Sequence, residues 1–261
     1  MNLDRIVNKA IETIKKSENL ALSLNDKGFN LAFSGGKDSL VIYKLCQMAG
    51  VKFEANMQLT TVDPPQLLKF VKENYPDVIL NKPKLSLFQL IVKKGSLPTR
   101  QIRYCCESLK EHAGVGTVTI IGIRAAESAK RAKRQELTHS CIKGSDKFLL
   151  SPILQWSDRQ VWQFIKDNNL KYCELYDKGF KRIGCIFCPM ANTKIKAKER
   201  ELFPKFENAY KIAIKKLVEQ KGKYQNLNGD VDEIFNWWMS NDSIKVYQAK
   251  KLQLSFDFYS A

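Results

Sequence analysis

Apolar residues recur at helical spacing near the start of the chain, where Ile6, Ala10, Ile14 and Leu20 predict a helix within residues 3–24. Short apolar runs farther along predict strands, and the run Val118–Ile123 is the clearest because β-branched residues fill most of it. The predicted strands cover residues 29–33, 52–59, 77–81, 118–123 and 148–152. Helical spacing resumes after three of them, over residues 40–48, 65–75 and 158–167.

This alternation of strands and helices predicts an α/β fold with a parallel sheet flanked by helices. In such a sheet, ligands bind beyond the carboxyl ends of the strands, at the point where the strand order reverses. After residue 190 the pattern is helical and rich in lysine, with a loop at 222–229. The sequence therefore predicts a nucleotide-binding domain over residues 1–190 and a helical C-terminal extension over 191–261.

Composition narrows the class of protein. The chain has 261 residues, of which 44% are hydrophobic and 27% charged, so it can build a substantial core and is not a disordered or disulfide-stapled chain. It contains no apolar run of the roughly 18 residues that a membrane span needs. No apolar signal core follows Met1. We therefore expect a cytoplasmic protein that does not act in a membrane.

The charge balance is strongly basic, with 43 Lys and Arg against 27 Asp and Glu, a net charge of +16. Residues 1–190 carry +12 of this, so the excess is not confined to a basic tail. Such a field favours polyanions or highly charged nucleotides as ligands. The alternative is a solubility role shared by many lysine-rich proteins.

The segment Ser34-Gly35-Gly36-Lys37-Asp38-Ser39 has the chemistry of a phosphate cradle. Its glycines allow close backbone approach, and its N–H groups at a helix start attract anions. Lys37 adds a positive charge, the serine hydroxyls can donate to phosphate oxygens, and Asp38 suits Mg²⁺. The spacing is not that of a Walker A loop. A plain Gly-Gly turn with an exposed lysine is the alternative, which the predicted strand before and helix after disfavour.

Cysteines form the second constellation. Cys105 and Cys106 are adjacent, and Cys185 and Cys188 form a C-x-x-C pair between Gly184 and Pro189. Four thiolates suit zinc or an iron–sulfur cluster. Neighbouring side chains diverge, so an adjacent pair fits a cluster better than one small ion. A redox pair or buried packing cysteines are the alternatives. The other cysteines are Cys46, Cys141 and Cys173.

Residues 34–39 resemble the PP-loop of the adenine nucleotide α-hydrolases, which include ATP pyrophosphatases, tRNA thiolases and the phosphoadenosine phosphosulfate (PAPS) reductase family. The cysteine quartet resembles the [4Fe–4S] ligands of adenosine phosphosulfate (APS) reductases within that family. Three further stretches resemble the same family in the same order, and together the matches span about residues 29–190. These stretches are residues 122–131, 151–162 and 175–185.

The resemblance implies a Rossmann-like PP-loop fold and a set of site residues. Residues 34–39 would grip the nucleotide phosphates, with Lys37 and Asp38 serving the chemistry. Asp63 would orient the adenosine, and the loop at Gly122 would bring Arg124, Ser128 and Arg131 to the sulfate or phosphate end. Arginine forks recognise such oxygens bidentately. Cys105, Cys106, Cys185 and Cys188 would hold the [4Fe–4S] cluster.

The chain departs from the assimilatory reductases at its end, because no cysteine follows Cys188 and the family's glutamate–cysteine–glycine tail is missing. A reductase would then need Cys46, Cys141 or Cys173 as its nucleophile. Cys46 lies at an apolar helix position and Cys141 on a predicted loop. Three features of the chain, the residues 60–65, the cluster cysteines and the missing tail, resemble the sulfur-transfer component of DNA phosphorothioation systems.

The leading hypothesis is thus an ATP-pyrophosphatase-type sulfurtransferase that uses ATP with Mg²⁺ and carries a [4Fe–4S] cluster. Its acceptor would be a nucleic acid, presented directly or through partner subunits. A cysteine desulfurase-like sulfur donor or a thiol reductant would complete the reaction. The alternatives are a PAPS or APS reductase that releases sulfite, and a nucleotide-binding regulator without turnover.

Overall fold

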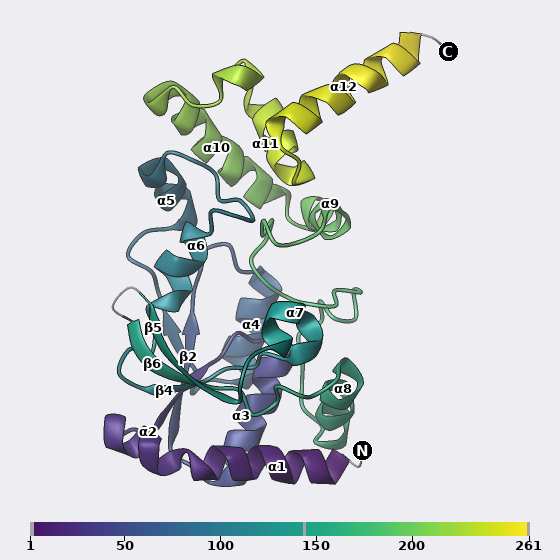
Figure 1. Cartoon of the computed structure of the whole chain (residues 1–261). Coiled ribbons are helices and arrows are strands. Elements are labelled where there is room, and N and C mark those ends of the chain that lie inside the picture. Colours follow the sequence, from purple (N-terminus) through teal and green to yellow (C-terminus); the bar gives the residue numbers. More distant parts are fainter. Residues whose placement is uncertain (1–2, 143–144, 260–261) are drawn as a thin grey trace. The chain divides into compact units, whose positions relative to one another are not determined.

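The computed structural model describes residues 3–142 and 145–259, without the side chains of residues 141, 142, 145 and 254–259 (Figure 1). The first half of the chain holds α1 (Leu3–Lys16), α2 (Glu18–Leu24), β1 (Phe29–Ala32), α3 (Lys37–Ala49), β2 (Phe53–Gln58), α4 (Pro65–Asn74), β3 (Ile79–Asn81), α5 (Leu87–Lys94), α6 (Tyr104–Cys106) and the π-helical turn Glu107–Glu111. The second half holds β4 (Val118–Ile120), the 3₁₀ turn Ala125–Glu127, α7 (Ala129–Ala132), β5 (Leu137–Ile142), β6 (Ser145–Leu150), α8 (Asp158–Asp167), α9 (Thr193–Leu202), α10 (Pro204–Lys221), the 3₁₀ turn Gln225–Leu227, α11 (Val231–Ser240) and α12 (Ile244–Tyr259).

The described residues form two compact units. The first consists of residues up to 59, 63–82 and 109–184, and the second of 60–62, 83–108 and 185 onward. Each unit is therefore assembled from separate stretches of chain. The division into residues 1–190 and 191–261 stays a prediction about domains.

All six strands of the sheet belong to the first unit, in the order β3-β2-β1-β4-β6-β5. Neighbouring strands run parallel except β5, which pairs antiparallel with β6. The chain builds outward from β1 through β2 to β3 and then returns to the other side of β1 with β4. The strand order therefore reverses between β1 and β4, so the loops that follow these strands flank the place where such sheets bind ligands.

A ladder of polar side chains crosses the centre of this sheet. Asn30 on β1 donates from Nδ2 to Thr119 Oγ1 on β4 at 3.1 Å and accepts from Asn56 Nδ2 on β2 at 3.1 Å. Asn81 on β3 donates in turn to Asn56 Oδ1 at 2.9 Å. The partners satisfy polar groups that would otherwise destabilise a buried strand, and they fix the register of the four strands.

Helix α3 is the central helix of the first unit and contacts both α1 and α8 (Figure 1). Apolar side chains on several sides of it are buried, including those of Leu40, Ile42 and Leu45. It ends at Gly50, whose φ of 68° gives the left-handed cap that glycine adopts without strain. Because α3 is packed on several sides, its first residues are held in a fixed place after β1.

The second unit is mostly helical. Helix α10 packs against α5 and α11, and its buried face includes Tyr210, Ile214 and Leu217. Trp238 of α11 is also buried and donates from its indole N–H to the Pro98 carbonyl at 2.6 Å. Among the described residues, no helix has the length and apolar composition needed to cross a bilayer.

The structure confirms the α/β fold and all five predicted strands, with shifted ends. It differs from the sequence-based predictions in two places. The predicted helix over 3–24 is two helices separated at Ser17. The sheet has a sixth, antiparallel strand at residues 137–142, where Cys141 was predicted to lie on a loop; the side chain of Cys141 lies outside the described part. Residues 137–142 mix polar and apolar side chains, so their sequence lacks the apolar run that predicts a buried strand.

Candidate nucleotide and cysteine sites

The loop between β1 and α3 depends on its two glycines. Gly35 has φ of 70°, and a Cβ there would lie 2.7 Å from Leu67 Cδ1 and 2.8 Å from Val71 Cγ2. Gly36 is the N-cap of α3 in an extended conformation, with no side-chain cap. The glycines thus bring bare backbone to the positive end of a 13-residue helix, which favours anions.

The loop's hydroxyls and first N–H groups have local partners. Ser39 Oγ donates to the Gly36 carbonyl at 2.8 Å, and Ser34 Oγ donates to Ser39 Oγ at 3.3 Å. The Lys37 N–H donates to the Tyr176 hydroxyl at 2.8 Å. Burial raises the pKa of Tyr176, so the ring stays a neutral partner. The predicted cradle is therefore well ordered by its own contacts.

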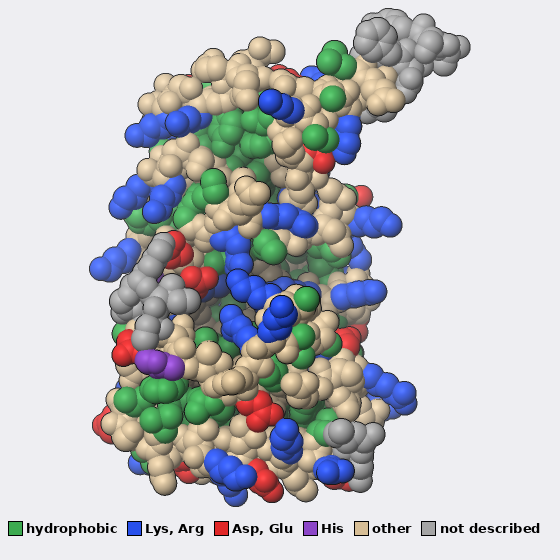
Figure 2. All heavy atoms as spheres, viewed as in Figure 1, with side chains coloured by type: hydrophobic (Ala, Val, Ile, Leu, Met, Phe, Trp, Pro, Cys, Tyr) green, Lys and Arg blue, Asp and Glu red, His purple; other side chains and the backbone are tan. Residues whose placement is uncertain are grey.

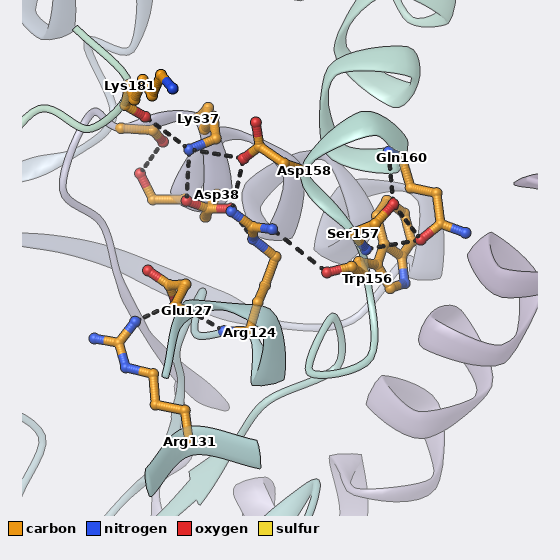
Figure 3. Close-up of polar contacts among 12 residues, drawn as sticks. Lys37, Asp38, Arg124, Glu127, Arg131, Trp156, Ser157, Asp158, Gln160 and Lys181 are labelled. Atoms are coloured by element: carbon orange, nitrogen blue, oxygen red, sulfur yellow. Dashed lines mark hydrogen bonds and ion pairs between the residues drawn. The ribbon is translucent and has the colours of Figure 1, made fainter. Parts of the chain in front are cut away.

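Four charged side chains meet beside this loop (Figure 3). Arg124 Nε donates to Asp38 Oδ1 at 2.7 Å, and Arg124 Nη2 donates to Asp158 Oδ1 at 2.9 Å. Lys37 Nζ lies 3.6 Å from Asp38 Oδ2 and 3.3 Å from Asp158 Oδ1. Lys37 also donates to the Lys181 carbonyl at 3.1 Å. Two cations and two carboxylates thus form a formally neutral group, which we call the charge quartet.

Members of the charge quartet differ in exposure. The side chains of Lys37 and Arg124 are each 4% exposed, whereas Asp38 is 20% and Asp158 62% exposed. Buried cations need compensating anions, which the two carboxylates supply. Sequence reasoning found three of the four residues. It missed Asp158, which stands in the first turn of the helix predicted over 158–167.

The loop after β4 lies against the start of α3. A Cβ on Gly122 would be 3.0 Å from the Asp38 carbonyl carbon and oxygen, so a side chain there would push the two backbone segments slightly apart. The close packing explains how Arg124, two residues on, reaches Asp38. Asp63, which follows β2, is buried in the same unit.

Ser128 and Arg131 lie on the next turns and have other partners. Ser128 Oγ accepts from the Arg131 N–H at 3.3 Å and caps α7. The Arg131 guanidinium pairs with Glu127, whose Oε2 also accepts from the Arg124 N–H at 2.9 Å. Burial raises the pKa of Glu127, but the Arg124 N–H and the charges of Arg131 and Arg182 outweigh burial and hold it below its usual value. Glu127 and the Arg124 backbone thus connect Arg131 to the charge quartet.

The four predicted ligand cysteines all belong to the second unit. A hydrogen bond with Cys106, burial, and the charges of Cys106 and Cys185 raise the pKa of Cys105. Burial raises the pKa of the Tyr210 hydroxyl, as do the charges of Cys185, Cys105 and Cys188. The two cysteine pairs, about 80 residues apart in sequence, are thus near enough to interact. We call them the cysteine site.

Buried groups hold the Cys185–Cys188 turn from several sides. Phe187 has φ of 56°, and its N–H donates to Glu199 Oε2 at 2.8 Å. The Ile186 N–H donates to the Val62 carbonyl at 2.8 Å, and Tyr210 donates to the Ile186 carbonyl at 3.3 Å. Burial raises the pKa of Glu199 to about 7. Helix α9, which supplies Glu199, therefore supports the turn that carries two of the thiols.

Lys196, one turn before Glu199 on α9, is also buried. Its ammonium donates to Asn241 Oδ1 at 2.7 Å and to the Trp238 carbonyl at 3.2 Å. Burial lowers the pKa of Lys196 to about 8, while the nearby Cys188 raises it. Sequence reasoning missed both buried residues because their helix reads as a lysine-rich solvated face.

Among the described side chains, no three Cys, His, Asp or Glu groups converge as closely as one metal ion requires. The donor set is nevertheless chemically suited to a larger sulfur-ligated group, because four thiols share one unit and two elements present them in pairs. Neither Cys46 nor Cys173 joins this set. Both are fully buried, and burial raises the pKa of each thiol.

Comparison with known families connects this geometry to a group of enzymes. The sequence profile of the phosphoadenosine phosphosulfate reductase domain matches residues 28–191, which is more than half of the chain. The chain belongs to this family. The matched residues include the phosphate loop, the Arg124 loop and both cysteine pairs.

Curated relatives of this family member come from archaea, fungi and bacteria. An uncharacterized protein of Methanocaldococcus jannaschii is 32% identical over 82% of this chain and 54% of its own length. A Schizosaccharomyces pombe protein named "Probable FAD synthase" is 30% identical over 74% of this chain and 68% of its own. An adenosine 5'-phosphosulfate reductase of Oceanobacillus iheyensis is 34% identical over 47% of this chain and 53% of its own. The chain thus spans about half to two thirds of the length of these relatives.

Solved structures show the same fold. The FMN adenylyltransferase of Candida glabrata, in complex with FAD and inorganic pyrophosphate, matches with a TM-score of 0.52 and 18% identity. The match covers 70% of this chain and 64% of that one. The PAPS reductase family member described here therefore shares its architecture with an enzyme that handles adenine nucleotides.

Proposed function

We propose that this chain is an ATP-pyrophosphatase-type sulfurtransferase. It would bind ATP at the phosphate loop, transfer AMP to an oxygen of an acceptor, and support replacement of that oxygen by sulfur. One observation carries the nucleotide half of the proposal. Two buried cations, Lys37 and Arg124, meet bare backbone at the start of α3 at the point where the strand order reverses.

In the first step the acceptor oxygen attacks the α-phosphorus of ATP, and the bond between the α- and β-phosphates breaks. Lys37 and the helix N-terminus then stabilise the charge that develops on the departing pyrophosphate. In the second step sulfur at the oxidation level of sulfide bonds to the activated atom, and AMP leaves with the oxygen. A cysteine desulfurase-like partner with a thiol reductant would supply that sulfur.

A metal ion and a cluster belong to this proposal. Asp38 would hold Mg²⁺ beside the phosphates, where the ion would neutralise charge on the phosphate oxygens. Cys105, Cys106, Cys185 and Cys188 would hold a [4Fe–4S] cluster, which would supply sulfur-ligated iron. A cluster several ångströms wide accepts ligands that are too far apart for a single ion.

Two observations favour ATP over PAPS or APS as the nucleotide. A relative named for FAD synthesis aligns with 74% of the chain, and making FAD from FMN is an adenylyl transfer. A reductase needs an accessible thiolate. The described thiols outside the cysteine site, Cys46 and Cys173, are buried, and the pKa of each is raised.

A nucleic acid fits the charge of the chain as the acceptor. Lys and Arg side chains are spread over the face in Figure 2, in line with the net charge of +16. Such a surface attracts a phosphate backbone without reading its sequence. The DNA phosphorothioation component remains the branch that this proposal favours.

A PAPS or APS reductase is the second candidate, because APS reductases are among the relatives. Anaerobic turnover separates the two. Purified protein is incubated with Mg-ATP, APS or PAPS, each with and without short DNA, and the products are resolved by chromatography. The proposal expects AMP and pyrophosphate from ATP, with both lost in Lys37→Ala and kept in Lys44→Ala, a control on the same helix.

Sulfite released from APS or PAPS while ATP stays intact would overturn the proposal and establish the reductase. Nucleotide binding with no product from any of the three would instead identify a regulator.

A further inference from the structure

Asp158 has a position that the proposed chemistry does not use. Its Oδ1 accepts from Arg124 Nη2 at 2.9 Å and lies 3.3 Å from Lys37 Nζ, so one carboxylate oxygen faces both buried cations of the site (Figure 3). The rest of the side chain is in water, since 62% of it is exposed. The Asp158 carboxylate thus lies against both Lys37 and Arg124, beside the N-terminus of α3, which favours anions.

Capping of α8 does not explain this position. Ser157 is the N-cap, and its Oγ accepts from the Gln160 N–H at 3.3 Å. Gln160 Oε1 accepts in return from the Ser157 N–H at 2.8 Å. This capping box satisfies the helix end without Asp158. The carboxylate is directed to the two cations instead.

The two carboxylates of the charge quartet are not equivalent. Asp38 is 20% exposed, and Gly122 packs against its backbone, so it stays in place. Asp158 joins the site from another helix through a largely solvated side chain. Its departure would therefore expose little new surface and would leave Asp38 as the fixed counter-ion.

We propose that Asp158 is a displaceable counter-ion, which neutralises Lys37 and Arg124 in the empty site and gives way to the phosphates of the nucleotide. The inference rests on the proposed binding of a nucleotide at this loop. Phosphate oxygens and the Asp158 carboxylate carry like charge and would compete for the same two cations. Asp158 would thereby weaken the binding of every anion at this site, and ligands with several phosphate charges would compete with it better than singly charged ones.

Asp158→Asn tests this without turnover. Binding of inorganic pyrophosphate and of ATP is measured by calorimetry in the wild type, in Asp158→Asn and in Asp158→Glu. Removing one charge next to the ligand should tighten pyrophosphate binding by about fivefold. The effect is modest because the carboxylate is mostly solvated. Asp158→Glu keeps the charge and should bind as the wild type does.

Asp167→Asn is the matched control, because it makes the same change of charge at the other end of α8. Asp167 is exposed, and its Oδ1 accepts from Gln163 Nε2 at 2.7 Å. It should leave affinity unchanged, which separates the local effect from the rise in net charge.

Unchanged or weaker pyrophosphate binding in Asp158→Asn would overturn the inference, and weaker binding would show that Asp158 positions Arg124. If the variant binds more tightly while ATP yields no product, the counter-ion is established and the proposed reaction fails. If no variant binds either ligand, both the inference and the proposed function fail.

Discussion

The two candidate sites differ in whether their charged groups have partners of opposite charge. In the first unit, Lys37 and Arg124 meet Asp38 and Asp158, so buried charge is balanced before any ligand arrives. In the second unit, a hydrogen bond with Cys106, burial, and the charges of Cys106 and Cys185 all raise the pKa of Cys105. The nucleotide site thus pairs its buried cations with carboxylates, whereas the raised pKa keeps the Cys105 thiol neutral unless a cation or cluster were to stabilise its thiolate.

The difference predicts how each site responds to change. Variants of a balanced site shift affinity gradually, since the remaining charges rearrange around the ligand. Variants of a site that needs its ligand lose that ligand outright. Three substitutions test this contrast, from the most severe to the mildest.

Cys185→Ala should have the largest effect. Cys185 contacts Thr60 and acts on both Cys105 and Tyr210, so it joins the two cysteine pairs. Anaerobically purified variant should lose its iron and brown colour, while binding of ATP stays within about twofold of wild type because no member of the charge quartet changes.

Cys46→Ala is the control, since Cys46 is fully buried in the first unit. It should keep wild-type iron content. Equal iron in Cys185→Ala and wild type would contradict the assignment of the cysteine site.

Glu199→Ala should have an intermediate effect. It leaves the Phe187 N–H without its acceptor inside a turn that already holds Phe187 at a positive φ. The loss should cost the iron-free protein about 1–3 kcal/mol of unfolding free energy, measured by urea denaturation. It should also slow the recovery of iron on reconstitution.

Glu199→Gln keeps an oxygen that can accept from Phe187 and should lose less than half as much. Equal losses in both variants would show that the carboxylate acts through its charge, not through the hydrogen bond to the turn.

The same contrast separates what the sequence could predict from what it could not. The phosphate loop follows from local chemistry, because Gly35, Gly36 and Lys37 must stand between a strand and a helix to work. Asp158 belongs to a helix about 120 residues later, and only the packing of α8 against α3 brings it to Lys37. Local patterns contain no information on that contact.

Glu199 and Lys196 illustrate a second limit. Hydrophobic patterning assigns charged residues to the surface, so a lysine-rich helix reads as exposed. Here α10 and α11 cover α9, and backbone groups of the cysteine turn and of α11 replace water as partners. The edge strand β5 was missed for a related reason, since an edge strand needs no continuous apolar run.

Glu127→Gln should have the smallest effect and tests the balance of charge in the first unit. Glu127 joins Arg131 to the Arg124 backbone, and its pKa lies below the usual 4.5. A carboxyl whose folded pKa is depressed contributes its stability above the unfolded value and loses it as pH falls through the folded value. Because the pair is partly solvated, the variant should lose about 0.5–1 kcal/mol at pH 7, and the difference from wild type should shrink below about pH 4. Glu12→Gln, which removes an exposed ion pair with Lys16, should change stability by no more than a few tenths of a kcal/mol at either pH. Urea denaturation of both variants at the two pH values measures this, and a Glu127→Gln loss that persists in acid would show that Glu127 acts through packing and not through its charge.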